Sequence, residues 1–321
     1  MPLLEVKSLK THFYTDEGIV KAVDGVSFHV DSGETIALVG ESGCGKTISV
    51  YSILRLIQPP GKIVAGEVVY SGVDLLKMPE KAMEGIRGKE ISIVFQEASA
   101  TFDPLFTIGH QIKEMIETHE KNTDKQEVQK KARHLLDIVN IPDAMQRMNS
   151  YPFELSGGML QRAMIALAIS CNPKVLIADE PTTSVDASNQ LQLLELMQGL
   201  VTKSKTALIL ITHNLGLVVR YASRVYIMYA GRIVETASLM EIFSNSQHPY
   251  TQALWACVPR LDRSKSDRLI PLDGQPPKLT NLPQGCRFAP RCNKRTSTCS
   301  EQEPVLVAIN EGHFVACHRV S

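Results

Sequence analysis

A glycine-rich octapeptide is the strongest chemical signal in the chain. Residues Gly40 to Thr47 fit the phosphate-loop pattern G-x-x-x-x-G-K-[ST]. In such a loop successive backbone N–H groups turn toward a β-phosphate at a helix N-terminus. The Lys46 ammonium neutralises β- and γ-phosphate oxygens, and the Thr47 hydroxyl ligates Mg²⁺. The pattern arises by chance in roughly one chain in a hundred of this length, so it predicts a nucleotide site.

A second group of reactive side chains ends a short apolar run. Residues Val175 to Glu180 form a strand pattern that finishes in two carboxylates. Open α/β sheets deliver the carboxyl ends of their strands to the edge where phosphates lie. We therefore expect Asp179 to hold Mg²⁺ and Glu180 to polarise water. Alone, an Asp-Glu strand end is commonly just solvated; beside a phosphate loop it indicates nucleotide hydrolysis.

Between these two motifs, the stretch from Leu155 to Arg162 opens a helical pattern with Ser156, Gly157 and Gly158. A serine followed by two glycines makes an exposed helix terminus that suits an anion. The alternative is a plain N-cap that only stabilises the helix.

The elements that position these motifs follow from hydrophobic periodicity. An apolar run over 35–39 leads into the glycine-rich loop, and apolar residues recur at helical spacing over 50–57. Strand signals vanish between about 98 and 170, where the spacing over 128–139 predicts an amphipathic helix. The remaining short strand-like runs cover 91–95, 175–178, 207–211 and 225–228. Strands alternating with helices predict a mostly parallel α/β sheet.

We therefore predict an α/β fold with a P-loop NTPase (RecA-like) core, a helical insertion and a loop-rich C-terminal cysteine extension. The expected boundaries are a nucleotide-binding domain over 1–240, with its helical subdomain at about 98–170, and an extension over 241–321. Prolines repeated through that last segment interrupt any long regular element.

Four of the seven cysteines crowd the last 36 residues with the spacing C-x5-C-x6-C-x17-C; they are Cys286, Cys292, Cys299 and Cys317. A reducing cytosol favours a metal or cluster site over disulfides for such a group. The spacing is wider than the paired C-x2-C of zinc knuckles. Four thiolates suit a 4Fe-4S cluster, and four-thiolate zinc or four unligated cysteines remain as alternatives.

Composition excludes several classes of protein. Thirty-four Lys plus Arg against 34 Asp plus Glu provide no broad basic field for nucleic acid. No apolar stretch approaches the roughly 20 residues that span a bilayer, and no secretory signal is visible at the N-terminus. We expect the chain to remain in the cytosol.

The order of the three motifs resembles the ATP-binding cassette family over residues 1 to about 240. In that family two cassettes pair head to tail, so the glycine-bearing helix would contact the γ-phosphate of ATP on the partner's loop. By the same resemblance, Gln96 senses Mg²⁺ and attacking water, Asp186 is a loop acid that crosses the dimer, and His213 contacts the γ-phosphate. Phe13 falls where an aromatic stacks on adenine, with Tyr14 as the competing choice.

These motifs and the resemblance together define the expected site. The catalytic residues are Glu180, His213 and Gln96, and the Mg²⁺ ligands are Thr47, Gln96 and Asp179. The ATP-binding residues are Phe13, Gly40, Ser42, Gly43, Cys44, Gly45, Lys46, Thr47, Ser156, Gly157, Gly158 and Asp186.

The segments Gln247 to Leu254, Gly274 to Pro277, Leu282 to Cys292 and Gly312 to His318 resemble the C-terminal extension of ATPase subunits of dipeptide and oligopeptide importers. The resemblance implies ATP, Mg²⁺ and a 4Fe-4S cluster held by the four tail cysteines. It also implies a paralogous ATPase partner and two transmembrane permease subunits that contact the segment 102–109. Through these subunits the chain would serve an extracytoplasmic peptide-binding protein indirectly, from the cytoplasmic face of the membrane. The alternatives are a nickel or other small-solute importer and a non-transport ATPase.

The tail itself has few large apolar side chains to bury, so metal–thiolate bonds would replace a core. Because the tail lies far in sequence from the ATP motifs, we expect Cys292→Ser to unfold it while leaving ATP binding at Lys46 intact.

Overall fold

The computed structural model describes residues 1–182, 187–257 and 272–320, and it divides into two compact units. The first, the helical unit, comprises Met1–Leu3, Val30–Glu34 and Lys77–Ile211. The second, the phosphate-loop unit, comprises Leu4–His29, Thr35–Leu76 and Thr212–Ser321. Residue Asp186, an expected ATP ligand, lies outside the described residues.

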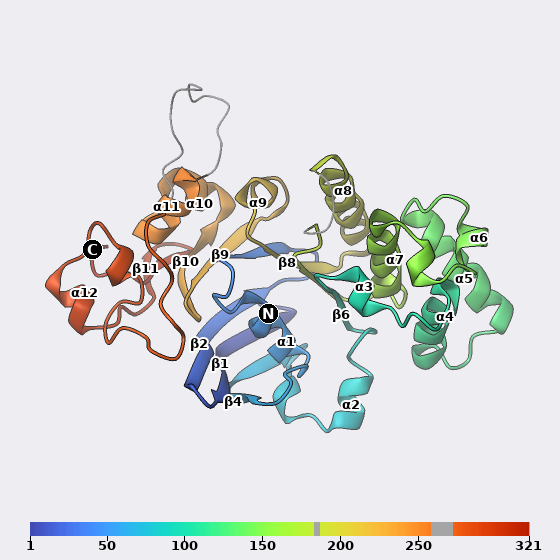
Figure 1. Cartoon of the computed structure of the whole chain (residues 1–321), viewed down its shortest axis with the longest axis horizontal. Helices are drawn as coiled ribbons and strands as arrows, with labels where there is room; N and C mark the ends of the chain where they lie inside the picture. The colour runs from blue at the N-terminus through green and yellow to red at the C-terminus, as the bar shows by residue number, and fades with distance from the viewer. Residues whose placement is uncertain (183–186, 258–271, 321) are drawn as a thin grey trace. The chain divides into compact units, whose positions relative to one another are not determined.

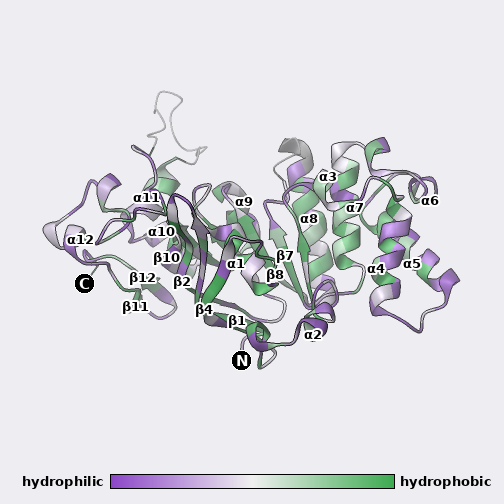
Figure 2. Cartoon of the chain, turned by 60° about the horizontal axis from the view of Figure 1, so that its bottom comes forward, coloured by the Kyte–Doolittle hydropathy of each residue, from purple (hydrophilic) through white to green (hydrophobic). Residues whose placement is uncertain are grey.

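Parallel strands form the centre of the helical unit. They are β6 (Ile91–Val94), β7 (Val175–Asp179) and β8 (Ala207–Thr212), in the order β6-β7-β8. Every residue of β7 and β8 is buried, and Figure 2 shows both strands as hydrophobic. Parallel strands covered on both faces read as continuous apolar runs, and this is why their positions could be predicted.

Helices make up the rest of the helical unit (Figure 1). The amphipathic prediction for 128–139 is confirmed, because Val128, Ala132 and Leu136 are buried on one face of α5 and Asp124 caps it by accepting from the Gln126 N–H at 3.0 Å. The helices are α2 (Glu80–Glu84), α3 (Ala98–Thr101), α4 (Ile108–His119), α5 (Lys125–Ile138), α6 (Ala144–Arg147), η2 (Pro152–Glu154), α7 (Gly157–Ile169) and α8 (Ala187–Ser204).

The phosphate-loop unit contains two groups of strands. An antiparallel sheet has the order β2-β1-β4-β5, formed by β1 (Leu4–Thr15), β2 (Gly18–Val30), β4 (Gly61–Tyr70) and β5 (Val73–Asp74). In the other group β3 pairs in parallel with β9, and β9, β10, β12 and β11 continue antiparallel. Its members are β3 (Thr35–Val39), β9 (Arg224–Tyr229), β10 (Arg232–Ser238), β11 (Val307–Asn310) and β12 (His313–Val315).

The helices of this unit are η1 (Leu75–Lys77), η3 (Ala289–Arg291), α1 (Lys46–Ile53), α9 (Leu215–Tyr221), α10 (Leu239–Asn245), α11 (Pro249–Ala256) and α12 (Ser297–Glu301). The C-terminal segment is thus more regular than predicted. Pro249 starts α11 instead of interrupting a helix, because the first turn does not use the missing N–H. Strand β12 pairs with β10, so the extension continues a sheet of this unit.

Candidate functional site

The phosphate loop connects β3 to α1, as its sequence context predicted. Helix α1 begins at Lys46, whose side chain is buried. The Lys46 ammonium donates to the carbonyl oxygens of Gly40 at 2.8 Å and Glu41 at 3.0 Å. The loop therefore curls around the ammonium of its own lysine.

Two glycines of the loop are required by close contact with backbone. A Cβ on Gly40 would lie 2.1 Å from the carbonyl oxygen of Met228. A Cβ on Gly45 would lie 2.1 Å from that of Ala22, and Gly45 has a φ of +106°, which side-chain-bearing residues rarely adopt. The shape of this loop is thus set by neighbouring strands of the same unit.

The other loop residues differ in access to solvent. Ser42 and Gly43 are exposed, Thr47 is half-buried and Cys44 is buried. Burial raises the pKa of the Cys44 thiol, although the nearby Lys46 charge opposes the change. The buried Cys44 sulfur lies 3.8 Å from the Lys46 ammonium nitrogen.

In the helical unit, the carboxylate pair ends β7 as predicted. Asp179 is fully buried, and Glu180 has a positive φ of 45°. The Glu180 N–H donates to the carbonyl of Ile211 at 3.0 Å, which holds this unusual conformation. The Gln96 amide donates to the Glu180 carboxylate at 3.4 Å. Gln96 and Glu180, selected separately from the sequence, are therefore neighbours.

The glycine-bearing helix α7 begins after Ser156, whose hydroxyl accepts from the Met159 N–H at 3.3 Å. A Cβ added to Gly157 or Gly158 would meet no atom within 4 Å. The Gln161 amide, from the same motif, donates to the Pro181 carbonyl at 2.7 Å. This contact, which sequence reasoning missed, ties the helix to the segment that follows Glu180.

The remaining predicted residues lie in the phosphate-loop unit. Phe13 is half-buried in β1 and pairs with Gly61 of β4, where an added Cβ would lie 2.6 Å from the Phe13 ring. The competing Tyr14 is exposed, with the Lys62 ammonium 5.7 Å from its ring centroid. His213 is exposed and follows β8.

Sequence reasoning missed the partners of Glu41, the second residue of the phosphate loop. Its carboxylate accepts from Arg291 at 2.7 and 3.0 Å, and its backbone N–H donates to the Tyr250 hydroxyl at 2.9 Å. Both partners lie in segments that resemble the C-terminal extension of peptide-importer ATPases, but the sequence suggested no role for either residue. The tail therefore contacts the phosphate loop although the two lie far apart in sequence, and the expected effect of Cys292→Ser on ATP binding stays a prediction.

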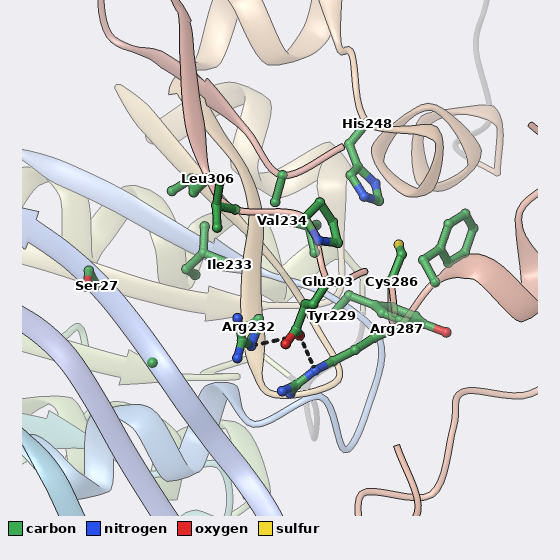
Figure 3. A pocket seen from close by; sticks show the side chains of 15 residues that line it. Ser27, Tyr229, Arg232, Ile233, Val234, His248, Cys286, Arg287, Glu303 and Leu306 are labelled. Carbon is green, nitrogen blue, oxygen red and sulfur yellow. Dashed lines mark hydrogen bonds and ion pairs between the residues drawn. The ribbon is translucent and has the colours of Figure 1, made fainter. Parts of the chain in front are cut away.

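A second arginine of the tail, Arg287, is buried beside a pocket of about 210 Å³ (Figure 3). It donates to Glu303 at 2.9 Å and to the Ala230 carbonyl at 2.6 Å, and it forms an ion pair with Asp24. Burial would raise the pKa of Asp24, but the Arg287 hydrogen bond and charge hold it below its usual value. Arg287 thus fixes the extension to β2 and to the β9–β10 turn.

The four tail cysteines, Cys286, Cys292, Cys299 and Cys317, all line one small cavity. Burial raises the pKa of Cys286 to about 11 and also raises that of Cys317, and Cys299 adds to both increases. Among the described residues, however, no group of three or more His, Cys, Asp or Glu side chains is arranged to hold a metal ion. Within the same part of the chain, no helix is both long and apolar enough to cross a membrane.

Two family models match the chain. Residues 23–183 match the model described as "ABC transporter", and residues 234–299 match the C-terminal region of oligopeptide/dipeptide transporters.

Curated relatives match over almost the full length. A probable peptide ABC transporter ATP-binding protein, y4tR, of Sinorhizobium fredii is 45% identical and covers 99% of this chain and 95% of its own length. The oligopeptide transport ATP-binding protein OppD of Bacillus subtilis is 46% identical, and the match covers 98% of this chain and 87% of OppD. The dipeptide transport ATP-binding protein DppD of the same species is 43% identical, with 98% and 94% covered.

Among solved structures, a dimeric ATP-binding cassette in a post-hydrolysis state with ADP and Pi is similar, with a TM-score of 0.67. It covers 74% of this chain and 98% of its own, at 24% identity. This likeness confirms the predicted fold.

Proposed function

The chain belongs to the ABC transporter family, as an ATPase related to the ATP-binding proteins of oligopeptide and dipeptide transporters, and we propose that its ATP hydrolysis powers peptide import. Full-length similarity to three transport proteins of this kind supports the proposal. The observation that carries the ATP-binding part is the curled phosphate loop around the Lys46 ammonium.

We assign the triphosphate to that loop. The loop backbone offers N–H groups apart from those of Glu41 and Cys44, which donate within the chain. Lys46 neutralises β- and γ-phosphate charge, and Phe13 stacks on adenine. The residue types Thr47, Gln96 and Asp179 are suitable oxygen ligands for Mg²⁺, which neutralises developing phosphate charge when bound. This part of the proposal rests on residue chemistry and on the family.

Hydrolysis needs a group that polarises water, and Glu180 is the candidate. Its side chain is held by the Gln96 amide and its backbone by Ile211. Gln96 orients that carboxylate, and His213 contacts the γ-phosphate. The base is thus fixed before nucleotide arrives, which limits the reorganisation that the reaction requires.

The open terminus of α7 supports pairing with a second cassette. Ser156 and Gly157 are exposed, Gly158 is half-buried, and a Cβ added at either glycine would meet open space. Such a surface suits the γ-phosphate on the loop of another cassette. We propose a paralogous ATPase as the partner, with Asp186 crossing the interface. The chain alone would then be monomeric or weakly associating.

We propose that two permease subunits dock on the segment that follows Gln96. Phe102 is buried in the helical unit, whereas Leu105 and Phe106 are 78% and 46% exposed. Because Leu105 and Phe106 are adjacent, they support a docking surface, which contiguous exposed apolar side chains form and isolated ones do not. Docking there places the chain on the cytoplasmic face of the membrane, where it would serve an extracytoplasmic peptide-binding protein only indirectly.

We propose that the four tail cysteines ligate a 4Fe-4S cluster, with four-thiolate zinc as the alternative. Four thiols line one cavity, and four of the tail's large apolar side chains (Val305, Leu306, Val307 and Phe314) are exposed, so a crosslink would contribute stability that the tail core lacks. Anaerobic purification with iron, sulfide and zinc analysis tests this. We expect to find iron, sulfide and broad absorption near 400 nm. About one zinc per chain without sulfide would indicate a zinc site, and the absence of both metals would indicate unligated cysteines.

Uptake by cells that lack the chain tests the transport proposal and its alternatives. Labelled di- and oligopeptide uptake should disappear, return with the wild-type gene, and stay absent with Lys46→Ala. Nickel uptake measured in parallel serves as the control. Loss of nickel uptake with normal peptide uptake would assign the chain to a nickel importer, and unchanged uptake of both would favour another solute or a non-transport role.

A further inference from the structure

The side chain of Glu41 makes a paired contact with the extension. Two nitrogens of the Arg291 guanidinium donate to its two carboxylate oxygens, at 2.7 and 3.0 Å. The Arg291 side chain is 4% exposed and that of Glu41 is 26% exposed. A bidentate pair of this kind fixes orientation as well as charge, because both groups are planar.

The backbone of Glu41 is held by the extension as well. The Tyr250 hydroxyl, which accepts from the Glu41 N–H, belongs to a fully buried ring at the start of α11. That ring packs against Tyr229 at 4.6 Å and Phe288 at 5.4 Å between centroids. Glu41 of the phosphate loop is thus held at two points, by the Arg291 guanidinium and by a hydroxyl of a buried aromatic cluster.

These contacts affect the charge that a nucleotide meets. Glu41 directly follows Gly40 in the loop, so a free carboxylate there would repel the phosphates. Arg291 cancels that charge. The carbonyl of Glu41 also accepts from the Lys46 ammonium, so a shift of Glu41 would disturb the loop cation.

The position of Arg291 is coupled to the cysteines by the chain itself. Arg291 ends η3 and directly precedes Cys292, whose N–H donates to the Ala289 carbonyl at 3.3 Å. Arg291 further donates to the Asp273 carbonyl at 2.9 Å. A change in the fold around Cys292 must therefore move the guanidinium.

We propose that Arg291 and Tyr250 are positioning residues for the phosphate loop, and that the folded state of the cysteine-bearing extension thereby sets the affinity of the chain for MgATP. The inference rests on the proposed ATP site at Lys46. It extends that site to a regulatory contact 250 residues away in sequence.

A double-mutant cycle on the full chain tests the electrostatic part by measuring Kd for MgATP. Arg291→Gln should weaken binding roughly five- to tenfold, because the Glu41 carboxylate then faces the phosphates unneutralised. Glu41→Gln should bind at least as tightly as wild type. Combining both substitutions should restore most of the affinity, a rescue that loss of folding does not produce. Thermal unfolding of each variant checks that the tail remains docked.

Two further variants test the mechanical part. Tyr250→Phe keeps the ring and removes the acceptor for Glu41, so we expect a smaller loss of affinity of roughly two- to threefold. Cys292→Ser should weaken MgATP binding in the wild-type chain and have little effect once Glu41 is replaced by Gln.

The outcomes separate this inference from the ATP site itself. If wild type binds no MgATP, both the site and the inference are overturned. If wild type binds, Lys46→Ala does not, and Arg291→Gln matches wild type, the inference alone is overturned. Equal weakening in Arg291→Gln and in the double variant would also contradict it. An unchanged Kd for Cys292→Ser would remove the link to the cysteines.

Discussion

The phosphate loop and the start of α7 are both glycine-rich, yet the structural surroundings of their glycines differ. In the loop, an added Cβ at Gly40 or Gly45 would collide with backbone of the same unit at 2.1 Å. At the start of α7, an added Cβ at Gly157 or Gly158 would enter open space. The first pair is required by the fold of the chain, whereas nothing in the described structure requires the second.

The loop glycines are therefore explained by folding, whereas the α7 glycines need another explanation. The phosphate loop is shaped by its own unit, so it is expected to bind nucleotide in the isolated chain. At the α7 terminus there is open space beside both glycines, so their small size suits a close approach by something outside this chain. The chain therefore contains one glycine-rich loop whose shape its own fold sets, and one glycine-rich helix start that its fold leaves open.

The largest effect is expected from Lys46→Ala. The ammonium is the cation that the loop holds with its own carbonyls, so its loss should abolish measurable MgATP binding. Titration calorimetry on the purified chain measures this, with thermal unfolding as the control for folding. An unchanged Kd for MgATP would show that this loop is not the nucleotide site.

The next effect is on turnover. Glu180→Gln keeps the shape of the side chain and removes the carboxylate, so hydrolysis should slow by roughly 10² to 10⁴ while MgATP still binds. Nucleotide-bound pairs should accumulate on gel filtration with the partner cassette. Near-normal hydrolysis would move the base to another residue, with His213 next to be tested.

A matched pair of glycine substitutions distinguishes the glycines that the fold requires from those that it does not. Gly45→Ala should lower the free energy of unfolding by roughly 3 kcal/mol, because of the backbone clash and the positive φ. Gly157→Ala should change it by less than about 1 kcal/mol and lower assembled ATPase activity on the order of tenfold. Equal destabilisation by both would show that the α7 glycines also serve the fold.

Much of this molecule could be predicted from local sequence. Strands β7 and β8 are continuous apolar runs, and α5 has one apolar face, so each carries its own pattern. The phosphate loop and the carboxylates after β7 are contiguous motifs. Such features depend on neighbours in the chain, and periodicity reports them.

Contacts between distant segments could not be predicted in this way. The Arg291–Glu41 pair joins residues 250 apart, and the Gln161 contact depends on where α7 packs. The prediction that prolines interrupt regular elements was wrong at Pro249. This residue begins α11, and the first turn of a helix tolerates proline. Arg287 and Arg291 lie in a segment that resembles the importer extension, and each is adjacent in sequence to a cysteine, which was the available signal.

The central claim is that this chain binds ATP by itself and needs a second cassette to hydrolyse it. The most direct measurement is the rate of ATP hydrolysis per chain as a function of chain concentration, with and without the paralogous cassette, at saturating MgATP. The claim predicts full nucleotide occupancy at low concentration with slow turnover, and a rate that rises with concentration or on addition of the partner. A full rate per chain that does not depend on concentration, in a sample that light scattering shows to be monomeric, would contradict it.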